Sequence, residues 1–323
     1  MFHFSKNLFY ASTALLLMLA ACNNEPNTKQ QSTVPVVYKQ VSPNFNADSA
    51  YYFIKTQVDF GSRVTNSVAH KKCGDWLVNE LNKYADNVIE QKTIITHFDG
   101  TKLNVRNIIA EINTKATNRI LLCAHWDSRD RADKDVVDKD KPILGANDGA
   151  SGVGVLLEIA RILKSNPIDI GVDIILFDAE DLGNNFRGNT YCLGSQYWSV
   201  NLHRPRYKAD FGILLDMVGA SNVVFNWEAN SVAKAKQVLE KVWGVAHNLN
   251  YGKHFAFVEV GGIDDDHVYV NQAGIPTINL IDFNAAGNFP EHHHTHRDNM
   301  NVIDRNSLKA VGQTVLETIY TYK

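Results

Sequence analysis

The chain has 323 residues, of which 45% are hydrophobic and 21% are charged. This is the composition of an ordinary globular protein, and the length allows one large α/β domain or two small ones. The formal net charge of −3 argues against nucleic acid as a partner, because phosphate binding requires a basic face.

Residues 1–21 are predicted to be an export signal. Lys6 supplies a positive charge, and a short apolar run that ends in small residues follows it. Because this run is too short to span a bilayer, a cleaved signal peptide is favoured over a membrane helix. We therefore expect an exported protein of the periplasm or cell envelope.

The stretch LAAC, residues 19–22, resembles the lipobox of bacterial lipoproteins, in which the cysteine is lipidated and becomes the mature N-terminus. Lipidation of Cys22 would anchor the protein to a membrane. The alternative is an ordinary signal peptide whose cleavage site happens to precede a cysteine. The polar segment that follows predicts a flexible tether over residues 22–45, with a single catalytic domain over residues 46–323.

Cys73, Cys123 and Cys192 are the remaining cysteines. Their odd number gives no closed disulfide framework, and no Cys-x-x-Cys pair is present, so a thiolate zinc site is not expected. Cys73 and Cys123 lie in apolar runs, which predicts that they are buried.

The spacing of apolar residues predicts an amphipathic helix over residues 69–85 and strands over residues 87–96 and 103–112. Four short and almost wholly apolar runs are typical of central strands buried on both faces, and they cover residues 120–124, 172–177, 211–218 and 276–281. Further helical patterns cover residues 152–164, 231–249 and 305–322. This alternation indicates an α/β fold with a mixed, mostly parallel central sheet and helices on both faces.

Ligands of such folds bind at the carboxyl ends of the strands, so the functional side chains should follow the apolar runs. The polar residues at these positions are His125, Asp127, Asp178, Glu180, Asp181 and Asp216, and the last run leads to FPEHHHTHRDN at residues 289–299. Asp148 lies in GANDGASG, between the first run and its helix; alone, it is explained equally well as a helix cap. Several carboxylates at one sheet edge are costly unless a cation neutralises them.

This mixture of oxygen and nitrogen donors favours zinc over magnesium or calcium, which prefer oxygen alone. Asp148, Asp181 and one histidine would leave the fourth position open, as in catalytic zinc sites. A phosphate loop is excluded because GANDGASG lacks the required glycine spacing and lysine. A serine hydrolase is excluded because the sequence has no G-x-S-x-G elbow.

The motifs HWDS, GANDGASG, FDAED, LLDMVG and HHHT occur in the order found in M28-type zinc aminopeptidases and in their single-zinc relatives, the animal-type glutaminyl cyclases. The resemblance extends from about residue 50 to the C-terminus. Three segments, YCLGSQYW, GGIDDDHV and FPEHHHTHRDN, are similar to segments of the cyclases. The sequence thus resembles a bacterial glutaminyl cyclase of the animal type, which implies the zinc aminopeptidase-like α/β/α sandwich.

The resemblance implies a role for each candidate residue. It places one zinc ion per chain on Asp148, Asp181 and His294, the histidine directly before the threonine. Glu180 aligns with the general acid/base of the family. Two acidic residues that hydrogen-bond near the substrate amine align with Asp216 and Asp265, and apolar pocket residues align with Phe186, Ile263 and Phe289.

The sequence also departs from the pattern of the family. Asp181 stands where animal cyclases and most aminopeptidases have glutamate, and His293 stands where animal cyclases have tryptophan. His292 and His296 are then expected to be loop residues.

The resemblance implies that the protein converts the N-terminal glutamine of peptides or proteins to pyroglutamate and ammonia. In this reaction, zinc polarises the side-chain amide and Glu180 moves the proton. The alternative is a dinuclear M28-type aminopeptidase, with His125 and Asp216 completing a second zinc site beside a bridging Asp148. A binding protein that kept the fold but lost catalysis is a third possibility, and the intact Glu180 argues against it.

Overall fold

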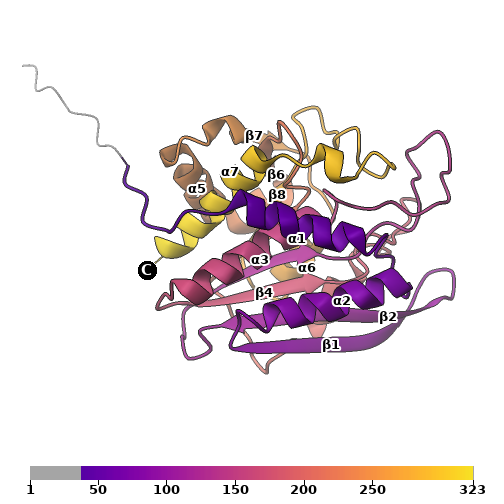
Figure 1. Ribbon diagram of the computed structural model, residues 1–323, viewed down its shortest axis with the longest axis horizontal. Coiled ribbons are helices and arrows are strands. Elements are labelled where there is room, and N and C mark those ends of the chain that lie inside the picture. Colours follow the sequence, from indigo (N-terminus) through magenta and orange to yellow (C-terminus); the bar gives the residue numbers. More distant parts are fainter. Residues whose placement is uncertain (1–37, 323) are drawn as a thin grey trace, which may run out of the picture. The chain divides into compact units, whose positions relative to one another are not determined.

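A six-stranded sheet forms the centre of the computed structural model, which describes residues 38–322 (Figure 1). In spatial order its strands are β1 (Asn87–Thr96), β2 (Lys102–Ile112), β4 (Gly171–Phe177), β3 (Arg119–His125), β5 (Phe211–Asp216) and β8 (Thr277–Ile281). The neighbours among β4, β3, β5 and β8 pair in parallel, whereas β2 pairs antiparallel with both β1 and β4. The mixed, mostly parallel sheet predicted from the sequence is confirmed.

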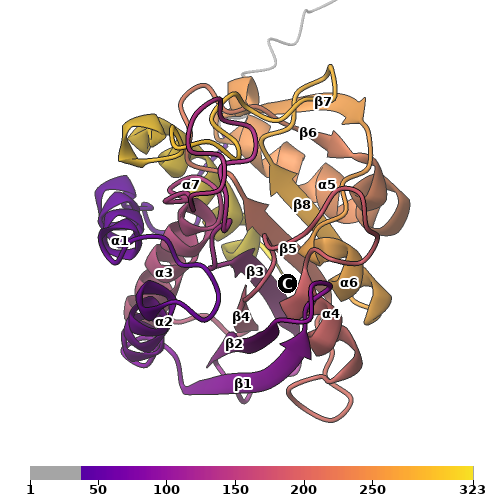
Figure 2. The same ribbon diagram turned by 90° about the vertical axis from the view of Figure 1, so that its right-hand side faces the viewer.

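Helices cover both faces of this sheet (Figure 2). One face carries α1 (Ala47–Asp59), α2 (Val68–Leu81), α3 (Ala150–Ser165) and α7 (Arg305–Tyr320). The other face carries α4 (Leu193–Val200) and α6 (Asp266–Gln272), while α5 (Ala229–Asn248) packs against β8 and α7. A separate two-stranded sheet consists of β6 (Phe225–Glu228) and β7 (Phe255–Val260), and two short 3₁₀ helices cover Gly252–His254 and Met300–Val302.

Each central strand contributes to two hydrophobic cores because its side chains alternate between the faces of the sheet. In β3, Ile120 and Leu122 belong to the larger core shared with α1, α3 and α7. Leu121 and Cys123 belong to the smaller core, which also contains Trp198 of α4. All seven residues of β3 are buried, as the apolar run predicts for a strand covered on both sides.

Helix α3 packs directly on the sheet, and a glycine makes this close approach possible. A Cβ atom on Gly152 would lie only 2.1 Å from the backbone oxygen of Leu215 in β5. The first turn of α3 can therefore lie beside the end of β5. This position brings the loop before α3 to the edge of the sheet where β3 and β5 end.

The N-terminal part of the described chain differs from the expected tether. Residues 38–45, which the sequence assigned to the tether, pack against α7. The Glu317 carboxylate accepts hydrogen bonds from the backbone N–H groups of Val41 (2.9 Å) and Ser42 (2.7 Å), and Gln313 Oε1 accepts one from Phe45 N (2.9 Å). Phe45 is also buried in the larger hydrophobic core, so both hydrogen bonds and packing against distant residues hold this segment.

The predicted export signal and Cys22 lie outside the described residues. Among residues 38–322, no helix has the length and apolar character needed to cross a membrane.

Candidate active site

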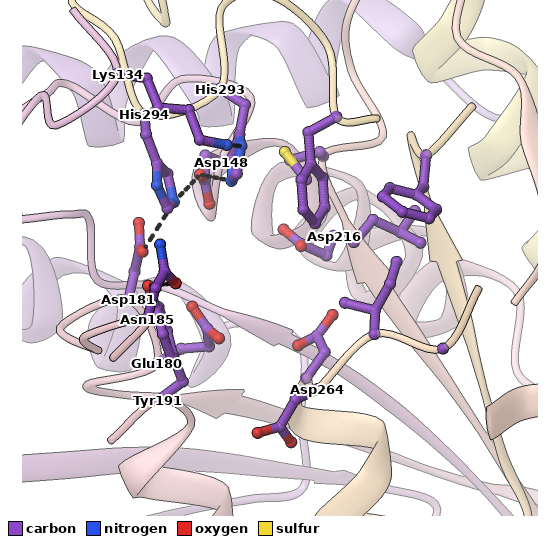
Figure 3. A pocket seen from close by; sticks show the side chains of 17 residues that line it. Lys134, Asp148, Glu180, Asp181, Asn185, Tyr191, Asp216, Asp264, His293 and His294 are labelled. Carbon is purple, nitrogen blue, oxygen red and sulfur yellow. Dashed lines mark hydrogen bonds and ion pairs between the residues drawn. The ribbon is translucent and has the colours of Figure 1, made fainter. Parts of the chain in front are cut away.

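A cavity of about 340 Å³ opens at the carboxyl ends of β3, β4, β5 and β8 (Figure 3). It collects most of the residues that the sequence singled out. Those that line it are Asp148, Glu180, Asp181, Asp216, Ile263, Asp265, Phe289 and His294. Motifs that are far apart in the sequence thus lie in one site, because each follows a parallel strand and the carboxyl ends of these strands lie at the same edge of the sheet.

His294 lies close to both of the other expected ligands, Asp148 and Asp181, although the group whose donor atoms all lie within 4.8 Å of one another here is Asp148, His293 and His294. His294 Nε2 lies 3.2 Å from Asp181 Oδ1 and 3.7 Å from Asp148 Oδ2. Ligand atoms about 2.0–2.1 Å from a tetrahedral zinc ion lie roughly 3.3 Å from one another. The Oδ2 atoms of both aspartates are buried and have no hydrogen-bond partner among the described residues. Buried, unpartnered carboxylate oxygens are costly, and a bound cation would satisfy them.

Electrostatics at the three side chains also fits a cation. Burial and the nearby Asp181 charge raise the pKa of Asp148. Although burial lowers it, the pKa of His294 is raised to about 9 by the charge of Asp181 and by the nearby carboxylates of Asp133 and Asp148. The carboxylates therefore favour positive charge at this point, and a metal ion supplies that charge in place of a proton.

Hydrogen bonds with a residue that follows the neighbouring strand β3 hold the backbone around Glu180 and Asp181 in place. The Asp127 carboxylate, just after β3, accepts hydrogen bonds from the backbone N–H groups of Glu180 and Asp181, both at 3.1 Å. The preceding residue, Ala179, adopts a left-handed conformation with a φ of 55°. Such conformations are uncommon for residues other than glycine and occur where surrounding contacts enforce them. The acidic pair is thus fixed in place by its surroundings.

Arg129 and Asp133 support the metal site from the loop after β3, and sequence reasoning missed both. The Arg129 guanidinium donates to Asp181 Oδ1 (3.0 Å) and to both oxygens of Asp133 (2.8 and 2.9 Å). Asp133 Oδ1 in turn lies 3.4 Å from His294 Nδ1. A carboxylate behind a metal-binding histidine orients the ring and fixes its tautomer. Their positions in a charged loop gave no periodic signal.

The loop that carries Asp148 is held by another carboxylate that sequence reasoning missed. Asp298 accepts hydrogen bonds from the backbone N–H groups of Asn147 (2.7 Å) and Asp148 (3.0 Å). Burial is the main cause that raises the pKa of Asp298 to about 7. Asp298 belongs to FPEHHHTHRDN, so its place within that motif was the available signal.

A second group of possible metal ligands shares Asp148. His125 Nε2 lies 3.1 Å from Asp148 Oδ1 and 3.2 Å from Asp216 Oδ1, and His125 Nδ1 lies 3.4 Å from Asp127 Oδ1. The three side chains His125, Asp148 and Asp216 are the ones that a dinuclear site would require. In a site with a single metal, His125 Nε2 would instead keep its hydrogen bond with Asp216 Oδ1 at 3.2 Å.

Glu180 and Asp265 face each other on the opposite side of the cavity. Donor atoms of Glu180, Cys192 and Asp265 all lie within 4.8 Å of one another. Burial raises the pKa of Glu180 well above its usual range, and the charges of Asp181, Asp265 and Asp266 add to this effect. Asp265 is held by Asn279, whose side-chain amide donates to Asp265 Oδ2 (2.6 Å). Glu180 thus lies close to Asp265 and Cys192, although its neighbour in the chain is the expected ligand Asp181.

The other histidines of residues 289–299 have different surroundings. The His293 ring lies between Phe289 (4.2 Å between ring centroids) and His294 (3.7 Å), and its Nδ1 is in contact with the Lys134 ammonium. His293 and His294 could also form a metal group with Asp148. His292 Nε2 lies 2.9 Å from Asn147 Nδ2, whereas His296 is exposed.

The apolar wall of the cavity contains two of the three expected pocket residues. Ile263 and Phe289 line it together with Phe283, which sequence reasoning missed and whose ring centroid lies 4.9 Å from that of Phe289. Phe186 lies outside the cavity, with 97% of its surface exposed, although the neighbouring Asn185 lines it. This placement corrects the expectation for Phe186: its segment is a turn, in which Asn184 Oδ1 accepts from the Phe186 N–H (2.9 Å) and directs the ring outward.

Comparison with known proteins identifies relatives of this chain. Residues 107–319 match the model of peptidase family M28. A solved structure of the Bacteroides thetaiotaomicron glutaminyl cyclase bound to N-acetylhistamine is 48% identical, with a TM-score of 0.85, and the match covers 88% of this chain and 100% of that one.

Two curated relatives are more distant. The glutaminyl-peptide cyclotransferase of Bos taurus is 24% identical over 74% of this chain and 72% of its own length. The aminopeptidase YwaD of Bacillus subtilis is 29% identical over 68% of this chain, but the match spans only 44% of that protein. The family match covers most of the chain and includes every residue that lines the cavity, while β1 and the start of β2 lie outside it. The chain therefore belongs to peptidase family M28.

Proposed function

We propose that this protein is a zinc-dependent glutaminyl cyclase that acts on peptides or proteins with an N-terminal glutamine. One observation carries the proposal: His294 Nε2 lies 3.2 Å from Asp181 Oδ1 and 3.7 Å from Asp148 Oδ2, in a cavity that Glu180 also lines. The 48% identity to the Bacteroides glutaminyl cyclase supports the same activity.

Asp148, Asp181 and His294 would hold one zinc ion per chain. When bound, zinc polarises the carbonyl of the substrate's side-chain amide. Asp133 and Arg129 keep His294 and Asp181 in position for this role. The unpartnered oxygens of the two aspartates support the presence of a cation.

Glu180 would move the proton in the reaction. The α-amine nitrogen of the substrate attacks the carbonyl carbon of the side-chain amide, and a C–N bond forms that closes a five-membered lactam ring. Glu180 accepts a proton from this amine and delivers it to the amide nitrogen, whose bond to carbon breaks to release ammonia. The substrate supplies both reacting groups, so their proximity lowers the entropic part of the barrier.

The remaining cavity residues would bind and orient the glutamine. Asp216 and Asp265 are placed to accept hydrogen bonds from the amine, while Ile263 and Phe289 offer apolar surface to the methylene groups of the side chain. A cavity of about 340 Å³ suits one residue and its peptide bond, and lies at the lower end of the volumes of ligand pockets.

The second candidate function is that of a dinuclear aminopeptidase. It is favoured by the group of His125, Asp148 and Asp216, and by the similarity to the Bacillus aminopeptidase. Counting zinc in purified protein and assaying ammonia release from a glutaminyl peptide separates the two functions. We expect one zinc per chain and ammonia release. Two tightly bound zinc ions, with release of free amino acids, would instead establish the aminopeptidase.

We also propose that the protein is exported and held on a membrane by a lipid on Cys22. The support is the LAAC motif after an apolar run, in a segment outside the described residues. Cys22→Ser should release the protein from membranes and leave turnover unchanged. Membrane association that survives this substitution would refute the anchor.

A further inference from the structure

Cys192 is a buried residue at the start of α4 that touches the proposed proton-transferring residue. It is fully buried and adopts a left-handed conformation, with a φ of 56°. Its thiol Sγ lies 3.2 Å from Glu180 Oε1. The thiol donates this hydrogen bond, and the Glu180 oxygen accepts it.

The backbone at Cys192 is fastened to the segment that carries Glu180. The Cys192 N–H donates to the backbone oxygen of Glu180 (2.9 Å), and the Leu193 N–H donates to that of Ala179 (3.0 Å). The next N–H, of Gly194, donates to the oxygen of Asp178 (3.0 Å). The first turn of α4 and the acidic segment therefore form one unit, in which the thiol has a fixed position relative to the Glu180 side chain.

The thiol is the single hydrogen-bond donor that the described side chains offer to the Glu180 carboxylate. Among the other charged groups near Glu180, His125 attracts its carboxylate, whereas Asp181, Asp265 and Asp266 repel it. None of these groups donates a hydrogen bond to it among the described residues. Without the thiol, the Glu180 side chain would therefore lose the one hydrogen bond that fixes its orientation toward the substrate amine.

We infer that Cys192 is a positioning residue, whose thiol holds the Glu180 carboxylate in the orientation that proton transfer requires. This inference rests on the proposed function, because it assigns Cys192 a task in that reaction. It requires no change in the charge or oxidation state of the thiol. It predicts that any small side chain with a hydroxyl or thiol donor at this position supports the reaction, and that one without a donor does not.

The test compares Cys192→Ser with Cys192→Ala. Serine keeps a donor, whereas alanine removes it, and both residues tolerate the left-handed backbone better than a β-branched residue such as valine. For Cys192→Ala we expect kcat on a glutaminyl peptide to fall about tenfold, less than the roughly hundredfold loss that misplacement by 1 Å can cause. KM and zinc content should stay unchanged. Cys192→Ser should restore kcat to within about threefold of the wild type.

Cys123 provides the matched control. It is also fully buried, but it lies in β3, and its Sγ is 3.8 Å from the backbone oxygen of Ile213 instead of touching Glu180. Cys123→Ala and Cys123→Ser should change the melting temperature without a selective fall in kcat. These variants thus measure the general effect of altering a buried thiol.

The outcomes distinguish this inference from the proposed function. If Cys192→Ala keeps wild-type kcat, or if Cys192→Ser is as slow as Cys192→Ala with intact zinc and fold, the thiol does not position Glu180. If Cys192→Ala fails to fold, comparing Cys192→Ser with the wild type still decides, because a folded serine variant with a tenfold lower kcat contradicts the inference. If the wild type itself does not cyclise glutaminyl peptides, the proposed function fails instead.

Discussion

Asp148 and Asp181 are buried acidic side chains whose negative charges repel each other, and a cation between them would remove that repulsion. Asp181 has an arginine partner, Arg129, at 3.0 Å. Asp148 lies within reach of His125 and His294 but has an oxygen with no partner among the described residues. At the scale of single residues, the site thus separates groups that hold the metal from Glu180, which faces the substrate.

Separate substitutions of Glu180 and Asp181 should show that one residue moves the proton and the other holds the metal. Glu180→Gln should keep zinc and fold but lose about two to four orders of magnitude in turnover, the usual range for a general acid/base. Asp181→Ala should lose the zinc itself. Metal content and turnover measured on both variants check this expectation. Near-normal turnover of Glu180→Gln would show that Asp265 or Asp216 moves the proton.

Asp133 should matter for zinc affinity although it does not touch the metal. Asp133→Asn weakens the contact with His294 and the pairing with Arg129, so we expect zinc affinity to fall about 10–100-fold. Competition with a chromophoric chelator measures this change. Asp130→Asn is the matched control, because Asp130 pairs with the surface residue Arg131 in the same loop. Equal affinities of the two variants would contradict the role of Asp133.

Local patterns and family resemblance predicted only part of this site. Spacing does not distinguish the four nearby histidines, and only the resemblance singled out His294. No pattern in the sequence indicated that Asp133 would lie beside it. The contact forms because the loop after β3 folds back onto residues distant in the chain. Phe186 shows the opposite case, because resemblance to the family predicted a pocket residue, but the side chain lies in a turn and is exposed to solvent.

At the scale of elements, the strongly apolar segments were predictable, whereas segments without a clear apolar pattern or start signal were not. Strands β3, β4, β5 and β8 follow from runs that are buried on both faces. Helix α4 has only eight residues and starts from the left-handed Cys192 without a side-chain cap, so it lacks the usual signals of a helix start. Strand β7 is largely exposed, and burial therefore left no clear pattern in its sequence.

The junction between β3 and α3 depends on Gly149, the N-cap of α3. Gly149 has a φ of 89°, and an added Cβ would lie 2.6 Å from the backbone oxygen of Asp127 and 2.9 Å from His125 Cε1. Gly149→Ala should therefore lower both the melting temperature and the zinc content, because Asp148 would have to move. The measurements are thermal unfolding and metal analysis.

Gly100→Ala serves as the control for this substitution. Gly100 has a similar φ of 93° but nothing within 4 Å of an added Cβ, so it reports the backbone cost alone, about 1–2 kcal/mol. A melting temperature that falls equally in the two variants, with zinc retained in both, would show that the contacts around Gly149 do not constrain the site.

At the scale of the whole molecule, zinc should link the ends of β3 and β4 to the loop that carries His294. Because the metal binds the folded state, its removal should lower stability by about 4 kcal/mol when free zinc is 1,000-fold above Kd. Treatment with a chelator should lower the melting temperature, and added zinc should restore it. Asp181→Ala, which we expect to lack zinc, should show no response. An unchanged melting temperature in the wild type would mean that the metal does not couple these segments.

Mass spectrometry of a peptide with N-terminal glutamine tests the central claim most directly. After incubation with the purified, zinc-loaded protein, we predict that the peptide loses one ammonia and keeps all its residues. The same peptide without protein corrects for spontaneous cyclisation. A peptide that is shorter by its N-terminal residue, with free glutamine in solution, would contradict the account and identify the protein as an aminopeptidase.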